Sequence, residues 1–386
     1  MPTAMSDVPH RRLSAFYFLY FALLGCIAPF WGLYLQHQSF TAQEIGSLMA
    51  AFAAIRVIAP NLWAWWAGYF SSPITMVRYS GVLTVVCFSA VWWASDYNLM
   101  LMVMVAYGFF WAAMLPQYET IAMQALKNRI DDYSRIRVWG SIGFIVMVLL
   151  LGQLFDGLSL SWLPAFMLLT MVLIVLNSLL FSAGHYRVRR QQQQSTSFIS
   201  QLKQRPVIVF IVMTILLQIS HGAYYTFFSI YLEQAGYSKS EIGLLWSLGV
   251  LAEVVLFWQF HRVMHRLSWR SWILLSLLIT AVRWWLIAGF VGSLWVLLIA
   301  QVFHAFTFGA MHAVAMRYVQ HYFSPATQAR GQALYSSIGF GLGGALGAWG
   351  AGIMWHYYAG ELVFLVSSAV ALVAILISWA GLRPDE

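Results

Sequence analysis

Charged residues are scarce in this chain: Asp, Glu, Lys and Arg together account for 9% of its 386 residues. Cysteine is scarcer still, and Cys26 and Cys87 both lie inside apolar runs, so the sequence predicts neither a disulfide framework nor a metal site. A phosphate-binding loop of the form GxxxxGK[ST] is absent, which argues against ATP as an energy source. No nucleophile–base constellation or metal-ligand spacing is present either. We therefore expect no enzymatic activity, no cofactor and no metal.

Apolar residues dominate instead. They make up 61% of the chain, against roughly 45–50% in a typical globular domain, and the mean hydropathy is +0.73. Apolar windows of about 20 residues, the length that crosses a bilayer, recur along the whole chain. We place them at 14–36, 43–69, 75–95, 97–124, 135–156, 160–183, 206–233, 241–261, 270–290, 293–321, 328–355 and 358–381. The sequence predicts an all-α protein with twelve transmembrane helices in a lipid bilayer.

The basic residues fall in short clusters between the apolar windows. Alternate loops hold Arg11, Arg12, Arg78, Lys127, Arg129, the basic residues of 187–205, Arg262, Arg266, Arg270, Arg330 and Arg383. The opposite loops hold almost none except Lys239. By the positive-inside rule, this asymmetry predicts that both termini are cytoplasmic. The net charge of +8 forms no stripe on an amphipathic face, so we expect no nucleic-acid partner.

A polar segment from Ser182 to Arg205 divides the windows into two sets of six. YLQHQSFTAQEIG, which begins at Tyr34, aligns with YLEQAGYSKSEIG, which begins at Tyr231, at an offset of 231 − 34 = 197 residues. We predict two pseudo-symmetric six-helix bundles, 1–183 and 206–386, joined by a cytoplasmic linker at 184–205. In such a repeat the substrate path lies between the bundles, near the middle of the bilayer.

Two charges deep in apolar sequence occupy equivalent positions of the halves. The repeat offset places Arg56 onto Glu253. An ionisable residue inside a span costs roughly 2.5–3.5 kcal/mol on insertion scales, so it usually has a function. We expect both to face one water-filled cavity, with Arg56 as a cavity charge. A desolvated carboxyl at Glu253 favours its neutral form, as proton coupling requires; the alternative is a Glu that is only hydrogen-bonded inside the protein.

A second pair of charges flanks a short polar turn. Glu119 lies near the end of one window and Arg137 near the start of the next. The arginine guanidinium is a planar fork that suits a carboxylate or vicinal hydroxyls. We therefore predict that Glu119 and Arg137 bind the solute; the alternative is a structural clamp across the hairpin.

Polar and aromatic residues share one helical face in the second half. Gln218, His221 and Tyr225 are spaced by three and four residues, so they project from the same side of a helix. We predict that they line a pocket for an aromatic ligand together with Tyr224 and Phe228, and that Trp246 also belongs to the substrate-binding residues. Simple packing of the helix is the alternative interpretation.

Two histidines, His304 and His312, lie in the tenth window, eight residues apart. This separation turns roughly 80° around an α-helix, so we expect the two side chains on different faces. We predict that His304 faces the cavity and that His312 is packed against a neighbouring helix.

Strings in both halves resemble the phenylpropionate permease family of the major facilitator superfamily, which is related to the lactose-permease-type proton symporters. These strings are YSRIRVWGSIGF (133–144), QISHGAYYTFF (218–228), LLWSLGVLAEVV (244–255), AVRWW (281–285) and HAFTFGAMHAVAMRY (304–318). The resemblance covers most of the chain, and it implies the two-bundle major facilitator fold.

The resemblance also implies roles for the substrate site. Glu119 and Arg137 match the carboxylate and guanidinium that hold the sugar in lactose-permease-type symporters. Phe144 is similar in position to a Trp that stacks on the sugar ring in those proteins.

For proton coupling, the resemblance implies Glu253, Arg283 and His304. These residues match a carboxylate, an arginine and a histidine in the eighth, ninth and tenth spans of the lactose-permease type. Thr307 stands where those proteins have a second carboxylate one turn after the histidine. The proton site is therefore expected to differ in detail.

These observations predict a monomeric secondary active transporter in the inner membrane of a bacterium. We expect it to take up a small organic solute together with protons, because no span holds the Asp cluster that sodium coupling would suggest. The resemblance favours an aromatic monocarboxylate such as phenylpropionate. One alternative is a carbohydrate or nucleoside proton symporter, and another, of a different class, is a non-transporting membrane sensor.

Overall fold

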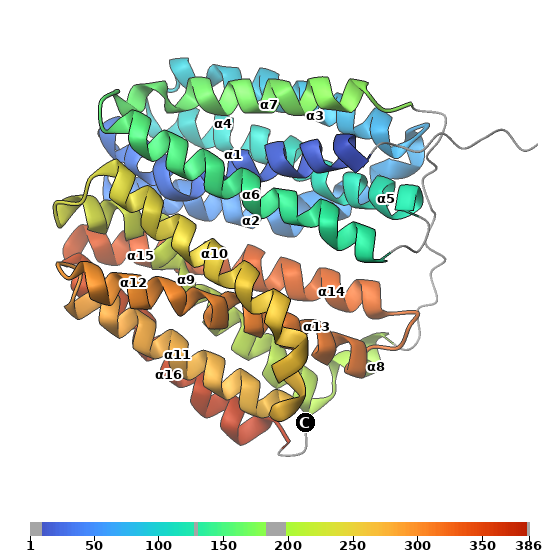
Figure 1. Cartoon of the computed structure of the whole chain (residues 1–386), viewed down its shortest axis with the longest axis vertical. Helices are drawn as coiled ribbons and strands as arrows, with labels where there is room; N and C mark the ends of the chain where they lie inside the picture. Colours follow the sequence, from blue (N-terminus) through green and yellow to red (C-terminus); the bar gives the residue numbers. More distant parts are fainter. Residues whose placement is uncertain (1–9, 127–129, 183–197, 384–386) are drawn as a thin grey trace, which may run out of the picture.

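The computed structural model describes residues 10–126, 130–182 and 198–383. Within these ranges every regular element is a helix, and twelve helical stretches are long and apolar enough to cross a membrane. The predicted fold class is thus confirmed. The spans that precede the linker lie together as one half, and the spans that follow it form the other (Figure 1).

The N-terminal half has six spans, and each contains one long helix or two consecutive ones. Its helices are α1 (His10–His37), α2 (Ala42–Trp66), α3 (Pro73–Ser89), α4 (Tyr97–Trp111), α5 (Met114–Leu126), α6 (Ile130–Phe155) and α7 (Leu163–Leu179). Short 3-10 turns extend three of the spans: η1 (Ala67–Tyr69), η2 (Ala90–Trp93) and η3 (Leu160–Trp162). Helices α4 and α5 together form the fourth span.

The C-terminal half repeats this plan with two interrupted spans. Its elements are α8 (Phe198–Leu202), α9 (Arg205–Gln234), α10 (Lys239–Val263), η5 (Met264–Arg266), α11 (Trp269–Gly289), α12 (Leu294–Val302), η6 (Ala305–Ala310), α13 (Met311–Tyr322), α14 (Gln328–Ser336), η7 (Ser337–Gly343), α15 (Gly344–Tyr357) and α16 (Gly360–Gly381). Segments η6 and η7 are π-helical, and each lies in the middle of a span. π-Helical turns of this kind occur frequently at functional sites.

The predicted division into 1–183, 184–205 and 206–386 stays a prediction. Residue 183 and residues 184–197 of the linker lie outside the described part of the chain, as do Lys127 and Arg129 of the loop before α6. The remainder of the linker contains the short helix α8 and the start of α9.

The repeat is visible in how the second span of each half begins. Thr41 caps α2 in a capping box with Glu44, and Ser238 caps α10 in the same way with Glu241. In both motifs the hydroxyl and the carboxylate each satisfy a backbone N–H that the helix leaves free. Both residue pairs are related by the offset that aligns the sequences.

The turns before these caps share an unusual backbone conformation. Ser39 has φ 66° and Gly236, at the equivalent position, has φ 92°. The left-handed region costs a residue with a Cβ roughly 1–2 kcal/mol, and glycine adopts it without that penalty. The N-terminal turn therefore carries a strain that the C-terminal turn avoids.

We expect Ser39→Gly to stabilise the protein by about 0.5–1 kcal/mol, since it removes this strain, and Gly236→Ala to destabilise it by a similar amount. The measurement is the thermal unfolding midpoint of each purified variant. A lower midpoint for Ser39→Gly would show that the serine makes a compensating contact.

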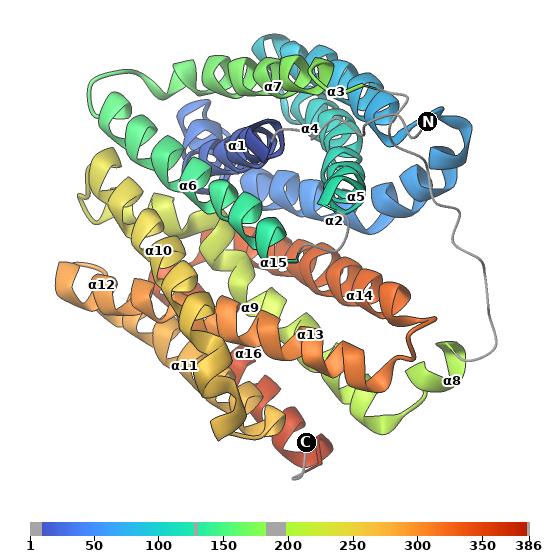
Figure 2. The same cartoon turned by 45° about the vertical axis from the view of Figure 1, so that its right-hand side comes forward.

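The two halves approach each other at one end of the molecule and diverge towards the end that carries α8 and the C-terminus (Figure 2). At the closed end α2 packs against α15, where a Cβ on Gly46 would lie 2.5 Å from the Cα of Gly352. Only glycine permits so close an approach of the two backbones.

A carboxylate joins the halves at the same end. Asp156, which follows α6, accepts hydrogen bonds from the backbone N–H groups of Lys239 (2.7 Å) and Ser240 (3.3 Å) at the start of α10. Desolvation acts to raise the pKa of Asp156, but the hydrogen bonds from Ser240 and Lys239 outweigh it and lower that pKa. An ionised carboxylate also interacts favourably with the positive end of the helix dipole.

Candidate functional site: charges between the halves

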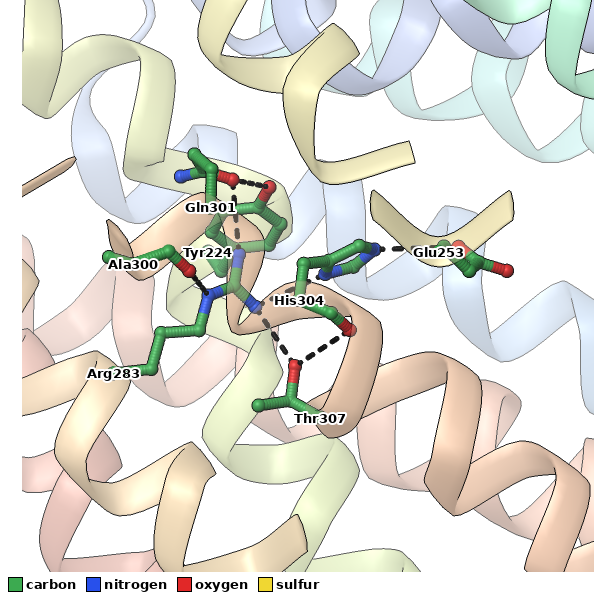
Figure 3. Close-up of polar contacts among 7 residues, drawn as sticks. All are labelled: Tyr224, Glu253, Arg283, Ala300, Gln301, His304 and Thr307. Carbon is green, nitrogen blue, oxygen red and sulfur yellow. Dashed lines mark hydrogen bonds and ion pairs between the residues drawn. The ribbon is translucent and has the colours of Figure 1, made fainter. Parts of the chain in front are cut away.

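A fully buried arginine organises the polar cluster of the C-terminal half. Arg283, on α11, donates from Nε to the carbonyl of Ala300 (2.8 Å) and from one terminal nitrogen to Gln301 Oε1 (3.3 Å). Its other terminal nitrogen donates to His304 Nδ1 (3.2 Å) and Thr307 Oγ1 (3.1 Å), as Figure 3 shows. All four acceptors are neutral groups. Within the described residues, the guanidinium has no carboxylate in ion-pair contact.

Two aromatic rings lie against this guanidinium. Its carbon lies 4.3 Å from the ring centre of Tyr224 and 4.6 Å from that of Trp284. The hydroxyl of Tyr224 also donates to Gln301 Oε1 (3.0 Å). Arg283 is 0% exposed, so cation–π contacts and hydrogen bonds stabilise a charge that no water reaches in this conformation.

The hydrogen bond from Arg283 fixes which nitrogen of His304 carries the proton. An arginine can only donate, so Nδ1 of His304 accepts, and the proton of the neutral ring is on Nε2. Nε2 lies 3.8 Å from Oε2 of Glu253, on α10. The three residues therefore form a line from a sealed cation, through an imidazole, to a carboxyl group that is 18% exposed.

Two glycines allow α10 to lie close to this cluster. A Cβ on Gly309, in η6, would lie 3.2 Å from Cγ of Glu253, and a Cβ on Gly249 would lie 3.3 Å from Gln301 Oε1. Gly249 and Glu253 are four residues apart, so they share the face of α10 that packs on η6. The π-helical turn directly after His304 thus packs against the Glu253 side chain.

Phe308 lies between the two histidines of the tenth span. Phe308 stacks on both rings, with centroids 5.6 Å from His304 and 6.2 Å from His312 and interplanar angles of 9° and 6°. His304 contacts Arg283 and lies near Glu253, whereas Nδ1 of His312 lies 3.4 Å from the hydroxyl of Tyr335, on α14. The two rings therefore have different partners, and His312 is packed against a neighbouring helix, as expected.

The N-terminal half holds the second cluster. Arg137, on α6, places Nε 3.7 Å from Oε1 of Glu119, on α5, and its guanidinium lies 4.4 Å from the ring of Phe21 and 5.2 Å from that of Tyr17. Tyr133 donates from its hydroxyl to the other oxygen of Glu119 (2.5 Å). The side chains of Arg137 and Glu119 are 37% and 31% exposed, so the pair remains accessible to a ligand.

The predicted aromatic pocket is mostly packed. The rings of His221 and Tyr225 lie 6.0 Å apart, and those of Tyr225 and Trp246 lie 6.3 Å apart. His221 is 1% exposed and shares a hydrogen bond of 2.8 Å with the carbonyl of Leu217, which makes its Nδ1 the donor.

The other members of the predicted site are buried as well, except for Tyr225. Trp246 donates from Nε1 to the hydroxyl of Ser229 (3.0 Å) and is buried, as are Gln218 and Phe144. Tyr225 is half-buried and interacts electrostatically with charges of both halves. Whether these residues bind the solute stays a prediction.

Charges of the two halves reach each other across the interface. Arg137 acts electrostatically on Glu253, and Arg56, on α2, acts on Tyr225. Tyr225 also lies within electrostatic reach of Glu253 and Arg283. Helices α6 and α10, which carry Arg137 and Glu253, pack against each other.

Sequence reasoning missed two residues that hold these clusters in place. Tyr133 binds Glu119, and Gln301 accepts from both Arg283 and Tyr224. Their spacing was the available signal: Tyr133 precedes Arg137 by four residues, and Gln301 precedes His304 by three. Among the described residues, no three His, Cys, Asp or Glu side chains gather closely enough to hold a metal ion.

Comparison with known proteins identifies the family. The model of the MFS_1 like family matches residues 10–366 of the chain. The chain belongs to this family of major facilitator transporters. It is therefore a multi-pass membrane transporter and not an enzyme.

Curated relatives of this transporter span its whole length. A probable 3-phenylpropionic acid transporter of Escherichia coli (strain K12) is 32% identical over 368 residues, which cover 95% of this chain and 96% of the relative. A maltose permease of Geobacillus stearothermophilus is 25% identical, and the match covers 94% and 92% of the two chains. The crystal structure of the nucleoside transporter NupG superposes with a TM-score of 0.85 at 17% identity, covering 97% and 99%. The last similarity shows the fold alone.

Proposed function

We propose that this transporter takes up an aromatic monocarboxylate, of the 3-phenylpropionate type, together with protons. The observation that carries the proton coupling is the line Arg283–His304–Glu253, in which the histidine directs its Nε2–H at a partly exposed carboxyl. A carboxyl at the end of such a line can take up a proton on one side of the membrane and release it on the other. The identity to the 3-phenylpropionic acid transporter supports the solute class.

In this proposal the residues divide into two groups. The first group borders the solute and consists of Glu119, Arg137, Phe144, Gln218, His221, Tyr225 and Trp246. The second group takes part in proton coupling and consists of Glu253, Arg283 and His304. Arg283 positions His304. If Arg283 and His304 moved away from Glu253 in another conformation, the proton affinity of the Glu253 carboxyl would change.

The positive-inside pattern supports a cytoplasmic location of both termini, in a bacterial inner membrane. The diverging end of the halves then faces the cytoplasm, and the conformation is inward-facing. The glycine contacts of α2 with α15 and the Asp156 cap of α10 close the opposite, outer end. A monomer suffices for this arrangement.

A carbohydrate or nucleoside proton symporter is the second candidate. It is favoured by the pair Glu119 and Arg137, whose planar guanidinium also suits vicinal hydroxyls, and by the 25% identity to a maltose permease. Because the chain belongs to a transporter family, we do not propose the alternative of a non-transporting membrane sensor.

We expect 3-phenylpropionate to raise the thermal unfolding midpoint of the purified protein, because a ligand that binds only the folded state stabilises it by mass action. Maltose and uridine at the same concentration should have no effect. Stabilisation by maltose or uridine, and none by 3-phenylpropionate, would contradict the proposed solute class and support the second candidate.

A further inference from the structure

Three of the arginines inside the spans, Arg56, Arg137 and Arg283, differ in what they contact. Arg137 has Glu119 as its counter-ion, and Arg283 is sealed from solvent with its nitrogens on four neutral acceptors. Arg56 is exposed, and no hydrogen bond or ion pair to another described residue involves it. Of the three, it is the guanidinium that remains free for an anion.

The position of Arg56 is set by an aromatic wall. Phe52 lies four residues earlier on the same face of α2, and its ring packs 5.3 Å from Tyr107 and 5.8 Å from Trp111. Trp111 in turn stacks on Tyr20, of α1, at 5.0 Å. Arg56 therefore emerges next to rings supplied by α1, α2 and α4.

Three tyrosines lie near enough to this guanidinium to interact with it electrostatically. Arg56 lies within electrostatic reach of Tyr20 and Tyr107 in its own half and of Tyr225 in the other half. The hydroxyl of Tyr107 is fully buried and has no hydrogen-bond partner within the described part of the chain. A buried hydroxyl without a partner costs free energy.

We propose that Arg56 binds the carboxylate of the substrate, with Tyr225 contributing a hydroxyl from the opposite half. This assignment rests on the proposed function and refines it: the carboxylate pairs with Arg56, whereas Arg137 keeps Glu119 and contacts another part of the solute. The guanidinium fork accepts a carboxylate in two parallel hydrogen bonds. The monoanion supplies the one negative charge that Arg56 lacks, and the neighbouring rings accommodate the aryl group in edge or offset contacts.

This arrangement would also connect binding of the substrate to the relative movement of the two halves. Arg56 belongs to α2 and Tyr225 to α9, so a carboxylate held by both side chains bridges the two halves. A neutral analogue of the same shape would fill the aromatic part of the site but would leave Arg56 without a counter-ion. Tighter binding of the acid than of the amide is therefore the result that identifies this contact.

The test compares 3-phenylpropionate with its neutral isostere 3-phenylpropionamide, by titration calorimetry at neutral pH, on the purified parent, Arg56→Gln and the matched variant Arg137→Gln. We expect the parent to prefer the acid by about tenfold or more, the value of a charge-assisted contact. Arg56→Gln should lose this preference and bind both compounds alike, whereas Arg137→Gln should keep it even if both affinities fall. Arg56→Lys keeps the charge without the fork and should retain part of the preference.

Each outcome bears on a different claim. If the parent prefers the acid and Arg56→Gln keeps that preference, the carboxylate lies elsewhere and this assignment is overturned while the proposed function stands. If the parent binds neither compound, both are overturned. Should Arg56→Gln fail to fold, Arg56→Lys decides: an unchanged preference for the acid contradicts the assignment, and a preference reduced about threefold or more supports it.

Discussion

Replacing Glu253 with glutamine is expected to abolish proton-driven accumulation of the solute while exchange of labelled for unlabelled solute continues. Glutamine has nearly the volume of glutamate and keeps a hydrogen-bonding head near His304 Nε2, but it cannot bind and release a proton at neutral pH. Exchange needs no net proton movement, so it tests binding and the conformational change alone. Both are measured in proteoliposomes, accumulation with an inward proton gradient and exchange at equal pH.

Glu361→Gln is the matched control, because Glu361 is exposed in the first turn of α16, away from the cluster. It should transport as the parent does. Full accumulation by Glu253→Gln would exclude Glu253 as the coupling residue and would direct attention to Glu119.

The second large effect concerns stability. Arg283→Lys should destabilise the protein by about 2–5 kcal/mol, because a lysine ammonium cannot reach the four acceptors that the planar guanidinium spans. Each buried acceptor left without a donor costs about 1–3 kcal/mol. The thermal unfolding midpoint of the purified variant measures the loss.

Arg205→Lys serves as the control for this substitution. Arg205 makes an exposed hydrogen bond to the carbonyl of Ala380 (3.0 Å), so its replacement should change the midpoint little. Equal midpoints for parent and Arg283→Lys would show that the cluster adapts to an ammonium and that the guanidinium geometry is not required.

The spans and the repeat could be predicted because each is recognisable from short stretches of the sequence. Apolar length gives each span, and a constant offset relates Tyr34 to Tyr231; the structure repeats even the turn conformation at Ser39 and Gly236. The pairing of Glu119 with Arg137 was also accessible, since one short turn separates their helices.

The contacts of Arg283 could not be predicted in the same way. The guanidinium contacts three side chains of an interrupted span, those of Gln301, His304 and Thr307. The periodicity of the sequence does not predict the π-helical segment η6 in this span. Helix spacing alone therefore could not indicate which side chains surround the guanidinium.

The free state of Arg56 likewise required the structure. Its position showed a deep charge, but sequence alone did not reveal that Arg283 is sealed from solvent while Arg56 is exposed without a counter-ion among the described residues. The difference arises from tertiary packing, because α9, α12 and η6 enclose the guanidinium of Arg283 on α11.

The most direct test of proton-coupled aromatic acid uptake is the initial rate at which labelled 3-phenylpropionate enters proteoliposomes with and without an inward proton gradient. The rate in protein-free liposomes is subtracted, because the protonated acid crosses lipid unaided. We predict that the protein-dependent rate rises with the gradient and that a protonophore removes the increase. A protein-dependent rate that is the same with and without the gradient would contradict proton coupling.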